Sequence, residues 1–283
     1  MTLRLDVNST LASTLEAATD DCAVKEVLRT PQLTVAAQRP LTPTEARTLT
    51  GRVARAMKFG DELQRWDDGA ALRARLTAVV LSDRCLARET GAPAEQVPGV
   101  TTGPNEILLR RASLARRSSV DAEVLAHELA HVQDLRMAGR REGQLPLYLQ
   151  EGKAYVIGVR YAATPQRLRQ LGDDLAQLTP EQARWVVQEF RSEHPQGNPN
   201  LSYLGEVAGA LFVEYLSAHV KRDALVRLGD AIEATGDGAR FTDEFERRFG
   251  LSLAAAEARF VAFIAETADD PRRRLAGTIF AGR

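Results

Sequence analysis

Two histidines and a glutamate stand at positions where they could bind and use a metal ion. The chain contains His127-Glu128-x-x-His131, set among small and aliphatic residues. Because each helical residue turns about 100°, the two imidazoles lie about 40° apart on one face and can share one metal ion. Glu128 can then reach a water molecule at that metal. Two hydrogen-bonded core histidines on an amphipathic helix are the alternative. Since two of only four histidines fall here, the spacing favours a metal site.

A carboxylate further along the chain completes a possible set of ligands. Glu151 follows His131 by 20 positions. Between them, Gly139 can end one helix and Pro146 can lie in the first turn of the next. A carboxylate on that next helix is an available third protein ligand for zinc. Taken alone, Glu151 could be an ordinary solvated helix carboxylate, but its spacing and the Gly-x-Ala that follows favour the ligand.

These motifs resemble the gluzincin zinc metallopeptidases, the group that includes thermolysin and the membrane-alanyl aminopeptidases. The match consists of His127-Glu128-x-x-His131 followed by Glu151-Gly152-x-Ala154, and it is most similar to the bacterial peptidase MA-like family. The resemblance extends over roughly residues 75–268. It implies a protease that binds one Zn²⁺ per chain and acts on a peptide or protein substrate. Endopeptidase and aminopeptidase activity both fit this pattern.

The resemblance also implies a hydrolytic mechanism. The metal is held by His127, His131 and Glu151, and one position stays open for water. Bound zinc would acidify that water, and Glu128 would take its proton as the water attacks a peptide carbonyl. Glu128 then passes the proton to the leaving amine.

Tyr203 is the expected second catalytic residue. In the families that this chain resembles, a tyrosine at the start of a later helix donates to the oxyanion, and Tyr203 matches it. A phenol suits this role because it is neutral at pH 7 and donates one directed hydrogen bond. A helix-start tyrosine with its hydroxyl in water is the other reading. Tyr215, His219 and His194 are alternatives for the same role.

The surroundings of the site can also be expected from position. Asp134, Tyr148 and Tyr155 have the helical spacing to orient the imidazoles. Gluzincins have a small twisted sheet whose edge strand pairs with the substrate backbone, and residues 103–110 occupy that place in the chain. Glu106 in this segment is interpreted as a solvent-facing carboxylate of an edge strand, without an amine-anchoring role.

Two other functions remain open. One is a non-catalytic binding module stabilised by zinc, although such a site has no use for Glu128. The other is a zinc hydrolase with a different substrate, or a regulatory metalloprotease with one specific protein substrate. No helix-turn-helix signal or basic face supports a link to DNA.

Composition excludes several classes of protein. In 283 residues, 44% are hydrophobic and 27% charged, with a net charge of −1, which is typical of a globular protein that does not bind nucleic acid. No apolar run predicts a membrane span, and residues 1–30 lack the apolar core of a leader. We expect a cytoplasmic protein if the chain is complete, and a periplasmic or secreted one if a leader was removed. Cys22 and Cys85 could pair after export, or remain buried thiols.

The helices and strands that would position the site are predicted from hydrophobic periodicity and from glycine, proline and capping residues. Before the site, we expect helices over 11–28 and from the capping box at Thr42 to Lys58, strands over 76–81 and 105–109, a long loop around 93–103, and the zinc helix over 120–138. After the site, helical spacing predicts helices near 146–162, 165–178, 180–193, 201–219, 222–234 and 252–267.

This order predicts an α+β fold, with a small twisted β-sheet lobe before the zinc helix and a mostly helical lobe after it. The metal would lie in the cleft between the two lobes. The expected division is an N-terminal lobe over 1–140, ending in the zinc helix, and a C-terminal lobe over 141–283 that carries the third ligand. Together they would form one catalytic unit.

Overall fold

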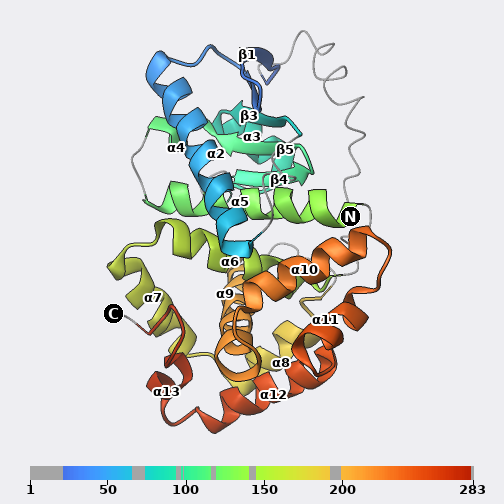
Figure 1. The fold of residues 1–283 in the computed structure, drawn as a ribbon. Helices are drawn as coiled ribbons and strands as arrows, with labels where there is room; N and C mark the ends of the chain where they lie inside the picture. Colours follow the sequence, from blue (N-terminus) through green and yellow to red (C-terminus); the bar gives the residue numbers. More distant parts are fainter. Residues whose placement is uncertain are drawn as a thin grey trace.

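In the computed structural model, the described residues are 22–65, 74–93, 97, 99–115, 119–139, 145–191 and 199–281. They confirm the α+β class: the strands precede the helix that carries the two site histidines, and a large helical assembly follows it (Figure 1). Most of the helix expected over 11–28 lies outside the described residues, as does His194.

The sheet has five described strands in the order β1-β2-β3-β5-β4. Their bounds are β1 (Lys25–Arg29), β2 (Leu33–Ala37), β3 (Leu76–Leu81), β4 (Gly99–Gly103) and β5 (Glu106–Arg110). The three inner strands run parallel, and each outer strand pairs antiparallel with its neighbour. The strand predicted over 76–81 is confirmed as β3, and the one predicted over 105–109 corresponds to β5.

Two predictions for this part of the chain are wrong. Lys25–Arg29 is strand β1, where a helix was expected, because a short turn returns the chain along it as β2. Gly99–Gly103 is strand β4, where a loop was expected, because the turn at Pro104 and Asn105 pairs it with β5. The edge strand beside the site is therefore β4, and the expected edge segment 103–110 is mostly the inner strand β5.

Three helices accompany the sheet: α2 (Pro43–Gln64), α3 (Asp83–Thr90) and α4 (Arg111–Ala115). The predicted capping box starts α2, since Thr42 and Glu45 each bond the other's backbone N–H. The helix does not stop at Gly60 as expected. A Cβ at Gly60 would lie 2.5 Å from Oε1 of Gln133, so this glycine permits close packing of α2 on the next long helix.

That next helix, α5 (Ser119–Ala138), carries the two site histidines and lies between two apolar cores. Leu125, Leu129 and Val132 pack into the core formed with the sheet and α2. Ala130 and Ala138 join the core of the helical part. The division of the chain at residue 140 stays a prediction, and α5 is the element that the two cores share.

The helical part follows α5. Its elements are α6 (Leu147–Ala162), α7 (Pro165–Ala176), α8 (Pro180–Gln188), α9 (Pro199–Tyr215), a π-helical turn η2 (Leu216–Val220), α10 (Ala224–Gly236), α11 (Phe241–Phe249), α12 (Leu253–Glu266) and α13 (Pro271–Leu275). The helices predicted after α5 follow it in order, and α11 and α13 are present in addition to them. The helix predicted over 201–219 ends in a π turn. None of the described helices is long and apolar enough to cross a membrane.

Cys22 and Cys85 form a disulfide, with their Cα atoms 5.5 Å apart. They belong to a small core that includes Ala36, Val79 and Leu81. These strand residues alternate with those that pack toward α5, so the disulfide lies on the opposite face of the sheet. The structure therefore favours the paired alternative of the two that the sequence left open.

Helices α6 and α9 cross with their backbones in contact. A Cβ added to Gly152 would lie 2.1 Å from the carbonyl carbon of Gly209, and one added to Gly209 would lie 2.1 Å from the carbonyl oxygen of Tyr148. Neither position tolerates a side chain unless the helices separate. Because Gly152 is next to Glu151 in α6, this contact fixes the position of the expected third ligand relative to α9.

We therefore expect Gly152→Ala to destabilise the fold by at least about 1–3 kcal/mol, the usual cost of overpacking. The measurement is urea unfolding followed by far-UV circular dichroism. Gly51→Ala is the matched control, since it also places a methyl group inside a helix. Its nearest obstacle is the movable end of Arg55, at 3.1 Å, so it should stabilise α2 by about 0.5–1 kcal/mol. Equal stability of the two variants would contradict the proposed close contact.

Candidate metal centre

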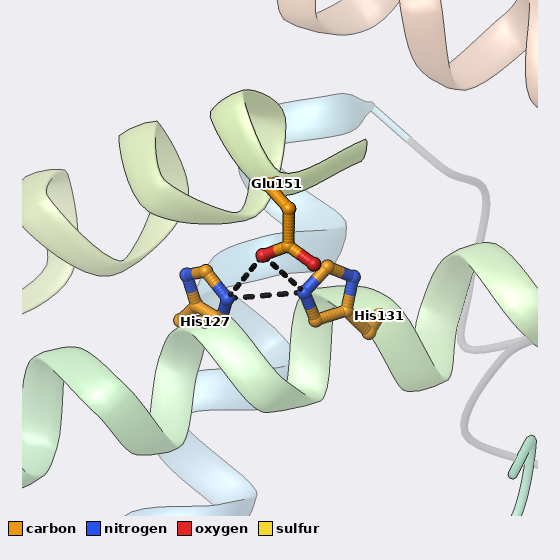
Figure 2. Close-up of side chains that lie close together, drawn as sticks. All are labelled: His127, His131 and Glu151. Carbon is orange, nitrogen blue, oxygen red and sulfur yellow. Dashed lines mark hydrogen bonds and ion pairs between the residues drawn. The ribbon is translucent and has the colours of Figure 1, made fainter. Parts of the chain in front are cut away.

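The two histidines of α5 and Glu151 of α6 meet between the helices (Figure 2). The Nε2 atoms of His127 and His131 are 3.0 Å apart. Oε2 of Glu151 lies 3.1 Å from Nε2 of His127 and 3.3 Å from Nε2 of His131. All three side chains are largely buried, and their ligand atoms point to a common centre. The sequence analysis assigned these three residues to one site, and the structure places them close together.

This triangle fits a small divalent metal ion. Ligand atoms about 2.0–2.1 Å from a tetrahedral zinc ion stand about 3.3 Å from one another, close to the three distances observed. Two imidazole nitrogens and one carboxylate oxygen also form a donor set that zinc uses in catalytic sites, whereas calcium and magnesium prefer oxygen ligands alone. The residues therefore fit the ion that the motif predicts.

The charges of the centre favour a cation. Burial favours the neutral form of His131, but the negative charge of Glu151, with smaller effects of two other carboxylates, raises its pKa to about 10. Burial likewise opposes charge on His127, yet its hydrogen bond with Glu151 contributes to a raised pKa. In the protein without metal, a proton therefore balances Glu151. A metal ion must displace that proton to bind.

Local sequence explains how the two helices come to face each other. Helix α5 ends where Gly139 adopts a left-handed conformation, with φ of 59°. Pro146 then occupies the N-cap of α6, one position before the helical start that was expected for it. Further along, a Cβ at Gly158 would lie 2.6 Å from the carbonyl oxygen of Glu123, so α6 also approaches α5 closely at this point. The reversal and the small residues bring Glu151 over the histidines.

Glu128 is hydrogen-bonded to the edge strand of the sheet. Its Oε2 accepts hydrogen bonds from the backbone N–H of Thr101, at 2.7 Å, and lies 2.9 Å from the hydroxyl of Thr101. That hydroxyl also lies 2.7 Å from the backbone carbonyl of Glu128. Glu128 is therefore oriented by β4, the edge strand, and its carboxylate is held beside the metal helix.

Tyr203 has a partner other than the three expected ligands. Its hydroxyl donates to Oδ2 of Asp174, on α7, at 2.7 Å. Burial and this hydrogen bond raise the pKa of Tyr203 to about 12, so the hydroxyl keeps its proton at neutral pH. Of the alternatives, Tyr215 and His219 pack against Phe263 of α12, and His194 lies outside the described residues.

The residues expected to orient the imidazoles have different partners. Tyr155 lies next to the centre, with its ring centroid 6.2 Å from that of His127, and its hydroxyl accepts from Arg167 at 2.7 Å. Tyr148 instead donates to Glu257 of α12 at 2.5 Å, in the core of the helical part. Asp134 forms a buried ion pair with Lys153 of α6.

Glu106 differs from the expectation of an edge-strand carboxylate in solvent. It begins β5, an inner strand, and its Oε1 accepts a hydrogen bond of 2.8 Å from the hydroxyl of Thr102. Its side chain is partly buried. Nothing in its contacts assigns it an amine-anchoring role.

Sequence reasoning missed three residues around the centre. Thr101 lies in the stretch interpreted as a loop, so its link to Glu128 was not visible. Arg167 contacts Tyr155 and Glu123 from the next helix, a pairing that no short motif encodes. Lys153 carried a usable signal, because it is one of four lysines and lies among apolar residues of a predicted helix.

No protein-family model matches the chain, and a search of the curated proteins finds no match. The resemblance to gluzincins therefore rests on the motif and on the geometry of the residues that compose it.

We expect the purified protein to bind about one zinc ion per chain through this centre. Glu151→Ala should weaken zinc binding strongly because it removes a ligand, whereas Glu128→Gln should leave the affinity nearly unchanged because Glu128 is bonded to Thr101. Competition with a chromophoric chelator measures both affinities. Stoichiometric zinc in a His127→Ala/His131→Ala variant would rule out this site.

Proposed function

We propose that the protein is a zinc-dependent metallopeptidase of the gluzincin type, which hydrolyses peptide bonds. The observation that carries the proposal is the convergence of three ligand atoms at 3.0–3.3 Å from one another, with a general-base candidate one residue from the first ligand. The ligands come from two helices and supply three donors. Structural zinc sites use four protein ligands, while catalytic ones keep a position open.

The residues of the chain divide the chemistry between them. His127, His131 and Glu151 would hold the metal, which when bound supplies Lewis-acid polarisation of the substrate carbonyl and of water. Glu128 accepts a proton from the water molecule while the oxygen of that water forms a bond to the carbonyl carbon. When the carbon–nitrogen bond breaks, Glu128 returns that proton to the leaving amine. The N–H and hydroxyl of Thr101 keep the carboxylate of Glu128 in position.

Strand β4 supports a peptide as the substrate. It is one of the two edge strands of the described sheet, and it runs beside the helix that carries the metal motif. An extended peptide can add to such an edge through main-chain hydrogen bonds, which require no particular side chain. In this proposal the scissile bond lies beside Glu128. The proposal moves the binding edge from the expected segment 103–110 to Gly99–Gly103.

Glu128→Gln tests the reaction directly. The amide keeps the shape of the side chain but cannot accept the proton of the water molecule, so we expect peptide hydrolysis to fall by about 10²–10⁴-fold. Zinc content and thermal stability should stay near those of the parent. A peptide library analysed by mass spectrometry measures activity and also locates the cleaved bond. Hydrolysis at the parental rate would show that Glu128 is not the base.

Tyr203→Phe tests the proposed oxyanion donor. In the proposal, the oxyanion replaces Asp174 as the acceptor for the hydroxyl of Tyr203. Removal of the hydroxyl should then lower kcat by about 10²–10³-fold with little change in KM, because the bond forms mainly in the transition state.

The control for this prediction is Tyr215→Phe, which removes a hydroxyl from a buried tyrosine of the same helix. Its ring packs against α12, so kcat should not change. Steady-state kinetics on one peptide substrate compares the two variants. A normal kcat in Tyr203→Phe would assign its hydroxyl a structural role with Asp174.

A further inference from the structure

Helices α5 and α6 share a buried ion pair that the proposed chemistry does not use. Nζ of Lys153 bonds Oδ1 of Asp134, and the side chain of each residue is 1% exposed. Burying two charges is costly, and apolar residues of similar volume usually stabilise a core at least as well. Stability alone is therefore a weak reason for this pair.

The position of the pair points to the metal centre. Asp134 follows His131 by three residues on α5, so both lie on the same side of the helix. Lys153 follows Glu151 by two residues on α6. The pair thus joins the same two helices that supply the three expected ligands, less than one helical turn from two of them.

Asp134 has a second feature that connects it to the centre. Its other oxygen, Oδ2, is buried and has no hydrogen-bond partner among the described residues. The negative charge of Asp134 acts on the ring of His131. Since Lys153 bonds only one oxygen of Asp134 in the pair, the other remains available to orient the imidazole, as carboxylates do beside metal-bound histidines.

We propose that Asp134 and Lys153 are positioning residues of the metal centre: their ion pair fixes α6 against α5 so that Glu151 meets the two histidines. The inference rests on the proposed zinc site. It adds that this ion pair sets the affinity of the site for zinc. Close contact with α9 holds α6 on one side through Gly152, and the ion pair holds it on the side of α5.

The test separates positioning from stability by removing both charges together. In Asp134→Leu/Lys153→Met, no unpaired charge remains buried, so the variant should fold with a Tm near or above that of the parent. Its dissociation constant for zinc should rise by about 10–100-fold, the usual effect of losing a partner of the ligands. The absorption spectrum of bound Co²⁺ should change as well, because the ligand geometry is no longer fixed.

Arg160→Met/Glu214→Leu is the matched control. It removes another ion pair of α6, formed with Glu214 of α9 at 2.6 Å. Neither residue contacts the three ligands, so zinc affinity and the Co²⁺ spectrum should match those of the parent. Weaker zinc binding in this control would overturn the inference, because the loss of any ion pair of α6 would then have the same effect.

The outcomes also distinguish this inference from the proposed function. If the parent chain binds no zinc, the proposed function fails and the inference fails with it. If the parent binds zinc and the folded charge-free variant binds it equally, the inference alone is overturned. If that variant does not fold, Asp134→Glu decides: it keeps the pair but moves the carboxylate, and unchanged zinc affinity would overturn the positioning role.

Discussion

The contact between α5 and α6 is the constraint on which the candidate centre depends. Two ligands lie on one helix and the third on the other, so their mutual distances are set by how the helices pack. Close approach at Gly158, the buried Asp134–Lys153 pair and the left-handed Gly139 at the reversal all act on this contact. The packing of small residues therefore has chemical consequences, because a shift of α6 would separate Glu151 from the histidines.

A second contact connects the sheet to the same centre. The two hydrogen-bonding groups of Thr101 hold Glu128 against β4. The position of the proposed base is thus set by a strand, while the ligands are set by helices. Since β4 is also an edge, the element that orients Glu128 is the one that can receive an extended peptide. Strand β4 would then position both the proposed base and the substrate.

Local patterns in the sequence predicted what depends on nearby residues. The four-residue spacing of His127 and His131 requires only a helix, and the capping box at Thr42 requires only its own turn. The reversal before Glu151 was likewise visible from Gly139 and Pro146. These features depend on interactions within a few positions of the chain, and a single sequence displays them.

The features that were not predicted depend on distant partners. Gly60 has the appearance of a helix end, yet its lack of a side chain accommodates Gln133, 73 positions later in the chain. Gly99–Gly103 begins and ends with glycine, and its strand becomes evident only through its pairing with β5. The hydroxyl of Tyr203 likewise donates a hydrogen bond to Asp174 on another helix. Tertiary contacts decide such positions, and no local pattern records them.

The place of α5 in both cores has a consequence for motion. Many two-lobed enzymes close around a substrate by rotation about a hinge between the lobes. Here, one ligand helix is packed into the sheet core as well as the helical core, and the other is in backbone contact with α9. Rotation between α5 and α6 would pull the ligand atoms apart. Any adjustment to a bound peptide would then fall on elements other than these two helices, which would move as one rigid body.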